Sequence, residues 1–319
     1  MNRKLSDGFL EELKIGILSP ILDRVKKDTT LSLEIREDYF NIYFKGSSLA
    51  KVVRFNKKSF ELTFKEEYFL NDIPAELCCR KIFNSKKDTE KWVQQICIYK
   101  DTIDLYSQLT ENREKICQQE IIWANNFNKL SGKTDYFIVD FEYNSQGYDN
   151  MDDKSANFDL IAFQWDSNPI ARKLQKGFLP IMTVIEVKFG DLALKDAAGI
   201  IKHCEDWINF KNSERNIKKL SKEMINIFSQ KRDLGLIPTL KTNKNPVRKI
   251  CENVKYAFVL IDQDPDSKIL SSELEKLSEN YVGQDERLND LYFGTSRFYG
   301  FGLFKDQFLS LQDFREKLN

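Results

Sequence analysis

The sequence predicts an α/β protein with a central mixed sheet flanked by helices, preceded by an N-terminal β-rich module. Three observations support this prediction. Strand-like alternating runs are interspersed with segments whose apolar residues recur at helical intervals. The last long run, Tyr256–Ile261, is entirely apolar, as in a strand covered on both faces. Hydrophobic residues make up 41% and aromatic residues 13% of the 319 residues, which argues against disorder.

The first 87 residues are expected to form a β-meander module. Residues 8–27 have the pattern of a short amphipathic helix. Turn residues such as Gly46-Ser47-Ser48 separate the runs that follow, which are rich in Ile, Val, Phe and Tyr. The expected strands of this module are Leu31–Arg36, Asn41–Phe44, Lys51–Phe55 and Phe60–Phe64.

Residues 88–319 are expected to form a second domain. Residues 88–130 are helical in pattern, with apolar side chains at three- and four-residue steps. Three strand-like runs follow, and a helix is expected from Leu192 to about Phe210. The three runs are Tyr136–Tyr143, Phe158–Phe163 and Ile181–Phe189. A basic insertion at 211–250 separates that helix from Tyr256–Ile261; it holds eleven basic and three acidic residues, a net charge of +8.

Composition excludes several classes of function. A single histidine, His203, excludes the usual zinc sites, and no GxSxG elbow supports Ser-His-Asp catalysis. The chain also lacks GxxxxGK[ST] and GxGxxG, so nucleotide-cradling loops are not expected. No run approaches 18 apolar residues, and the six cysteines show no CxxC spacing. We therefore expect a cytoplasmic protein with free thiols that does not act at a membrane.

Two acids and a lysine stand out on two of the strand-like runs. Glu186 and Lys188 end the apolar run that begins at Ile181, and strand alternation places both on one face. The run 27 residues earlier carries a single carboxylate, Asp159. Buried charges of this kind are costly unless they are paired or hold a metal. An ordinary salt bridge at a strand end is the simpler alternative.

The pattern is typical of a Mg²⁺ site for phosphodiester hydrolysis. Magnesium is bound by one or two carboxylates together with water and substrate phosphates. Asp159 and Glu186 would supply the carboxylates, and the main-chain carbonyl of Val187 could be a third ligand; Mn²⁺ could substitute. Lys188 would stabilise hydroxide or the negative charge of the transition state. The sequence therefore predicts a metal-dependent nuclease.

Residues 110–262 resemble the PD-(D/E)xK nuclease superfamily, which has the restriction-endonuclease-like fold. The resemblance rests on the order of a Glu-bearing helix, a strand, the Asp159 strand, the Glu186-Val187-Lys188 strand and a helix. It implies a Mg²⁺-dependent endonuclease that hydrolyses phosphodiester bonds, with DNA favoured over RNA, and it leaves a homodimer open. Phe158, where many members have proline, precedes Asp159.

The resemblance also implies further site residues. Some members carry an extra catalytic acid on the first core helix, and the matching position is Glu120, with Glu114 as the alternative. The helix after the motif would place polar side chains on the nucleic acid, and the basic insertion would add contacts to phosphates. The residues expected to bind nucleic acid are Lys195, Lys202, His203, Lys218, Lys219 and Lys222.

Three alternatives remain open at this point. The same fold could serve as a non-catalytic module that binds nucleic acid or protein. Residues 1–85 could recognise a partner protein and carry the nuclease core as effector. The basic insertion could also be a solvated segment without a ligand. Asp140 and Glu142 share one face of the first of the three strands with Ile138, and a solvated edge is favoured over a metal-binding role for both.

Overall fold

A computed structural model of the chain divides it into two compact units. The first unit comprises Met1–Lys129 and Asn226–Lys244, and the second comprises Leu130–Ile225 and Asn245–Asn319. The residues that the structure describes are 3–70, 77–110, 112–127, 131–145, 156–173, 177–196, 199–237, 247–281, 289–296 and 300–318.

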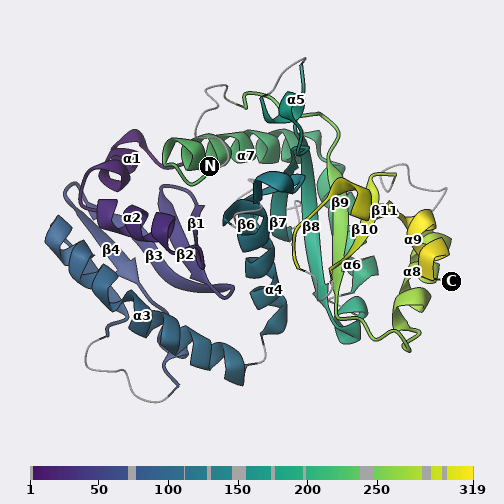
Figure 1. The fold of residues 1–319 in the computed structure, drawn as a ribbon, viewed down its shortest axis with the longest axis horizontal. Coiled ribbons are helices and arrows are strands. Elements are labelled where there is room, and N and C mark those ends of the chain that lie inside the picture. The colour runs from purple at the N-terminus through teal and green to yellow at the C-terminus, as the bar shows by residue number, and fades with distance from the viewer. Residues whose placement is uncertain are drawn as a thin grey trace. The chain divides into compact units, whose positions relative to one another are not determined.

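The first unit is built on an antiparallel sheet whose strands follow chain order (Figure 1). Four of its strands are those that the sequence predicted, with ends that differ by a few residues. The strands are β1 (Leu31–Ile35), β2 (Tyr39–Phe44), β3 (Ser47–Asn56), β4 (Ser59–Thr63) and β5 (Arg80–Phe83). Gly46 has a positive φ of 74° in the turn between β2 and β3, a conformation that favours glycine.

Aromatic side chains join two helices of the first unit to strand β4 and the residue that follows it. Phe9 lies 5.0 Å from Phe60, and Tyr99 lies 4.9 Å from Phe64, measured between ring centroids. The helices and turns are α1 (Asp7–Lys14), α2 (Ser19–Lys27), η1 (Glu66–Tyr68), α3 (Lys86–Leu109), α4 (Arg113–Ile122) and the π-helical turn η2 (Trp123–Phe127).

Two expectations for this part of the chain need correction. The single helix expected at residues 8–27 is two helices, because the chain turns around Gly16 and restarts with Pro20 in the first turn of α2. Helices α3 and α4, which the sequence assigned to the second domain, belong to the first unit. Tyr99 of α3 packs on the meander, which explains the assignment of that helix.

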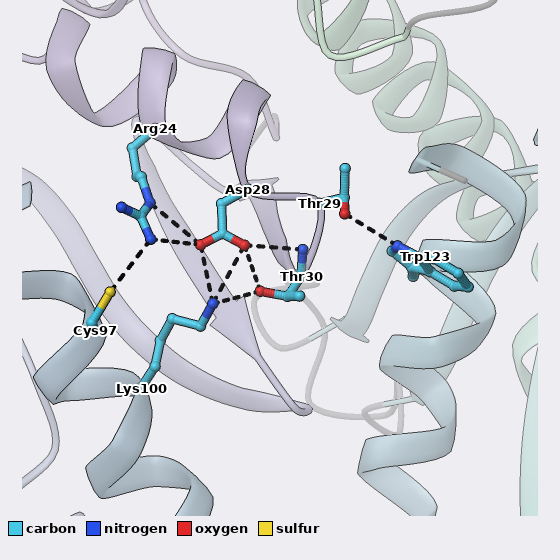
Figure 2. A network of polar contacts seen from close by, with 7 residues as sticks. All are labelled: Arg24, Asp28, Thr29, Thr30, Cys97, Lys100 and Trp123. Atoms are coloured by element: carbon cyan, nitrogen blue, oxygen red, sulfur yellow. Dashed lines mark hydrogen bonds and ion pairs between the residues drawn. The ribbon is translucent and has the colours of Figure 1, made fainter. Parts of the chain in front are cut away.

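A polar network around Asp28 joins α2 to α3 (Figure 2). The carboxylate of Asp28 accepts hydrogen bonds from Arg24 Nη2 at 2.9 Å, Lys100 Nζ at 3.0 Å and Thr30 Oγ1 at 2.6 Å. Burial alone would raise the pKa of Asp28, but the bonds from Thr30, Lys100 and Arg24 outweigh it and lower that pKa to about 2. The ionised carboxylate therefore stabilises this corner of the first unit.

Asp28→Asn should destabilise the protein by about 1 kcal/mol at pH 7, since a partly exposed network is screened by solvent. The pKa of Asp28 is lower in the folded protein than the ordinary value of 3.8, so its stabilisation is complete above that value. This stabilisation is lost as the pH falls toward 2. Urea titrations of both proteins between pH 7 and pH 3 should show the difference shrinking below pH 4. A difference that grows on acidification would contradict the assignment.

The second unit is built on a mixed sheet in the order β11-β10-β9-β8-β7-β6 (Figure 1). Strands β6, β7 and β8 are antiparallel neighbours, β9 and β10 run parallel to β8, and β11 is antiparallel to β10. The bounds are β6 (Tyr136–Asn144), β7 (Asn157–Gln164), β8 (Ile181–Phe189), β9 (Lys255–Ile261), β10 (Leu291–Ser296) and β11 (Leu309–Ser310). The predicted α/β class is thereby confirmed.

Helical crossovers connect the parallel strands of this sheet, as parallel pairing requires. The ring of Trp207 in α6 stacks on Tyr256 of β9 at 5.1 Å with an interplanar angle of 6°. The elements are η3 (Ser131–Lys133), α5 (Pro169–Arg172), η4 (Asp191–Leu194), α6 (Ile200–Lys211), α7 (Glu214–Asp233), α8 (Ile269–Tyr281), η8 (Lys305–Gln307) and α9 (Leu311–Leu318). Helix α7 is divided between the units, because its residues from Asn226 onward belong to the first unit. Within the described residues, no helix combines the length and apolarity needed to cross a membrane.

The edge strand β6 differs from the expected solvated edge. Pairing with β7 shifts register between Ile138 and Asp140, so Val139 is an extra residue of a bulge. Asp140 is fully buried and its Oδ1 accepts the amide of Phe141, whereas Glu142 is half-buried with a positive φ of 49°. The bulge breaks the alternation on which the prediction for Asp140 relied.

Candidate active site

The pairing of β7 with β8 ends just before the predicted motif. The last paired residues are Leu160 and Ile185, one step before Asp159 and Glu186. Beyond this point the Val187 amide donates to Oδ2 of Asp159 at 2.8 Å. The Asp159 side chain thus takes a main-chain donor of β8, and this bond holds its carboxylate beside the Glu186–Val187 peptide.

Glu186 and Lys188 are both buried at the same end of β8, each with 3% of its surface exposed. Lys188 Nζ lies 3.3 Å from Glu186 Oε1. His203 Nδ1, from α6, lies 3.0 Å from the same oxygen. The structure therefore brings the two motif acids, the motif lysine and the only histidine of the chain together at the C-terminal end of β8.

Hydrogen bonds join the residues that follow β8 and β9 next to the site. Gly190 ends β8 with a φ of 68°, and its amide donates to the carbonyl of Ile261 at 2.8 Å. The side-chain amide of Gln263 donates to the carbonyls of Lys188 and Gly190 at 3.4 and 3.5 Å. Sequence reasoning missed Gln263. Its position two residues after β9 could have indicated it, because β9 runs parallel to β8 and both strands end at the same end of the sheet.

Close packing at the start of α6 brings His203 to the site. A Cβ atom on Gly199 would lie 2.7 Å from main-chain atoms of Leu194 and Lys195, so glycine permits this approach. One turn into the helix, the carbonyl of His203 accepts the hydroxyl of Tyr256 at 3.4 Å. The small residues at 197–199 were expected to let this helix approach the sheet, whereas the close contact of Gly199 is with the turn that precedes α6. Ala197 and Ala198 lie outside the described residues.

The electrostatics keep the imidazole of His203 neutral at pH 7. Burial, reinforced by the positive charge of Lys188, lowers the pKa of His203 to about 4. A neutral imidazole can still donate Nδ1–H to a carboxylate. Burial also raises the pKa of the adjacent Cys204 thiol, and Glu186 adds to that rise. Cys204 is therefore a neutral thiol packed beneath the site.

The sequence predicts a hard divalent cation with few protein ligands at this site. Within the described parts of the chain, no group of three or more His, Cys, Asp or Glu side chains could hold a metal ion. Metal binding by the carboxylates of Asp159 and Glu186, completed by water and substrate phosphate, stays a prediction. The amide of Val187 donates a hydrogen bond to Asp159. Metal binding by the Val187 carbonyl stays a prediction.

Glu120 belongs to a different unit from the other predicted catalytic residues. It lies on α4 of the first unit, half-buried, whereas Asp159, Glu186 and Lys188 lie in the second unit. Burial raises the pKa of Glu120, and the charge of Lys45 partly offsets that rise. A catalytic role for Glu120 stays a prediction.

The lysines predicted to bind nucleic acid are spread over α6, α7 and the turn before α6. Lys202 is 44% exposed and pairs with Asp206, whereas Lys195 is half-buried. Lys218 is exposed and lies 2.7 Å from Glu214 one turn away. Lys222 is exposed and Lys219 is partly buried on the same helix.

Among the described residues of the basic insertion at 211–250, helix α7 is the main element, and not all of the basic charge is solvated. Lys231 Nζ lies 2.7 Å from Glu34 Oε2, and both side chains are buried. Lys211 Nζ lies 3.3 Å from Asp290 Oδ2. Lys241 and Lys244 fall outside the described residues. The charge available for phosphate contact is therefore smaller than the net charge of the segment.

Comparison with known proteins yields no relative of this chain: no protein-family model, curated sequence or solved structure matches it.

Proposed function

We propose that the protein is a metal-dependent nuclease that hydrolyses phosphodiester bonds, with DNA as the expected substrate and Mg²⁺ as the expected cation. The observation that carries the proposal is the convergence at the end of β8. Asp159 binds the Val187 amide at 2.8 Å, while Glu186 and Lys188 lie buried 3.3 Å apart beside it. A buried ion pair is often no more stabilising than apolar residues of similar size, so the stability of the fold does not by itself account for the Glu186–Lys188 pair.

The order of elements also supports the proposal. Strands β6, β7 and β8 and helix α6 occur in the order on which the PD-(D/E)xK resemblance rests, with the short helix α5 between β7 and β8. The Asp159 strand and the Glu186-Val187-Lys188 strand are sheet neighbours, and β9 lies on the other side of β8. This arrangement puts one acid on each of two adjacent strands, as the restriction-endonuclease-like fold would require.

Each side chain has a part in the proposed hydrolysis. Asp159 and Glu186 would hold the cation, and the Val187 amide would keep the Asp159 carboxylate in place. Bound there, Mg²⁺ or Mn²⁺ would polarise a phosphoryl oxygen and lower the pKa of a water molecule. The ammonium group of Lys188 would stabilise the negative charge that develops on the phosphate in the transition state.

Asp159→Asn should abolish detectable DNA cleavage and weaken Mn²⁺ binding at least 10-fold, because the neutral amide is a poor ligand for a hard cation. Cleavage of supercoiled and linear DNA with Mg²⁺ or Mn²⁺ and titration calorimetry with Mn²⁺ would measure both effects. Asp166→Asn is the matched control. Asp166 follows the other end of β7, where its carboxylate lies 2.7 Å from Lys305, and its loss should leave cleavage intact. Wild-type activity in Asp159→Asn would remove the proposed site.

A further inference from the structure

His203 is placed to act on Glu186 and not directly on a bound nucleic acid. Its Nδ1 lies 3.0 Å from Glu186 Oε1, and its side chain is 22% exposed, compared with 44% for the neighbouring Lys202. The imidazole nitrogen nearer the helix backbone is thus turned toward the motif strand. A phosphate contact, as the sequence suggested for His203, would have to use Nε2.

We propose that His203 is a positioning residue whose Nδ1–H holds the Glu186 carboxylate in the orientation in which it binds the divalent cation. This inference rests on the proposed nuclease function and adds to it a specific hydrogen bond. Metal-binding side chains are commonly oriented by outer partners, and loss of such a partner typically weakens metal binding about 10- to 100-fold.

The surroundings of His203 favour a fixed ring. Its amide donates to the Gly199 carbonyl at 3.2 Å and its own carbonyl accepts the Tyr256 hydroxyl, so the main chain is held on both sides. Lys188 Nζ shares the oxygen Oε1 with His203. Two donors from β8 and α6 therefore converge on one carboxylate oxygen, which restricts rotation of the Glu186 side chain.

Three substitutions separate the two ring nitrogens. His203→Asn places an amide nitrogen near the position of Nδ1, His203→Gln places one near Nε2, and His203→Ala removes both donors. Asn209→Ala, at an exposed polar position on the same helix, is the matched control for effects on the helix itself. Thermal unfolding of each variant should establish that the fold is retained.

Titration calorimetry with Mn²⁺, without nucleic acid, should show about 10- to 100-fold weaker binding for His203→Ala and His203→Gln. His203→Asn should bind within about threefold of wild type, as should Asn209→Ala. Affinity for a DNA duplex without metal should change little in all four proteins. Retention of Mn²⁺ affinity by His203→Gln with loss in His203→Asn would overturn the inference, as would unchanged affinity in all three histidine variants. If the wild type binds no Mn²⁺, the proposed function itself fails.

A measurement without metal tests the hydrogen bond directly. Because the chain has one histidine, long-range ¹H–¹⁵N spectra contain a single imidazole. At pH 8, above the ordinary histidine pKa of about 6.5, the ring is neutral and its tautomer can be assigned. We expect the proton on Nδ1. A proton on Nε2 would overturn the role of His203 without bearing on whether the protein is a nuclease.

Discussion

Lys188→Met should lower the single-turnover rate of DNA cleavage by about 10²- to 10³-fold, the usual cost of removing one preorganised donor from a transition state. The methionine side chain fills a similar volume at this buried position and cannot stabilise negative charge. Mn²⁺ binding should persist, because both carboxylates remain and His203 still contacts Glu186. Quenched-flow or gel-based rates at saturating Mg²⁺ would measure the loss.

The control for this variant is Lys305→Met. Lys305 also pairs with a carboxylate, Asp166 at 2.7 Å, and lies near the opposite end of the same sheet. Its removal should leave the cleavage rate within about twofold of wild type, as for most surface substitutions. A Lys188→Met protein that is folded, binds Mn²⁺ and cuts as fast as wild type would show that Lys188 has no part in the reaction.

Lys231→Ala should destabilise the first unit by about 3–5 kcal/mol, since breaking a buried pair leaves a charge in the interior. Lys231 Nζ and Glu34 Oε2 are 2.7 Å apart, and the side chains are only 5% and 2% exposed. Guanidinium titration followed by circular dichroism and tryptophan fluorescence would report the loss. Probe-dependent transitions would show whether the two units unfold separately.

The double substitution Glu34→Leu with Lys231→Met provides the matched comparison. Replacing both charges with apolar side chains of similar size should recover most of the lost stability, because no buried charge remains. A single variant that loses less than about 1 kcal/mol would mean that water or another group compensates Glu34. The pair would then be a minor contributor to the first unit.

Local patterns were sufficient to predict most strands of this protein. Alternation and β-branched runs located β1, β2, β4 and β8 to within a few residues, and the apolar run of β9 was correctly expected to be buried. The partners of helices could not be predicted in the same way. Nothing local in α3 indicates that Tyr99 packs on the β-meander, and the bulge at Val139 adds a residue without any change in composition.

The site could be predicted as a set of residues, whereas its contacts could not. Spacing placed Glu186 and Lys188 on one face of a strand, but pairing of β7 with β8 is a tertiary property. Gln263 and the direction of the His203 ring depend on how β9 and α6 pack against β8. Lys231 was counted in the basic insertion as charge available for phosphate contact, but it is an interior partner of Glu34.

The first unit is discontinuous in the chain, since residues 226–244 complete what residues 1–129 begin. The polypeptide passes through the whole motif region before it supplies Lys231 to Glu34. During synthesis, the N-terminal part must therefore wait for more than 90 further residues to emerge before that pairing can form. Likewise, recombination could not exchange the first unit for another through one crossover, because two junctions would be needed.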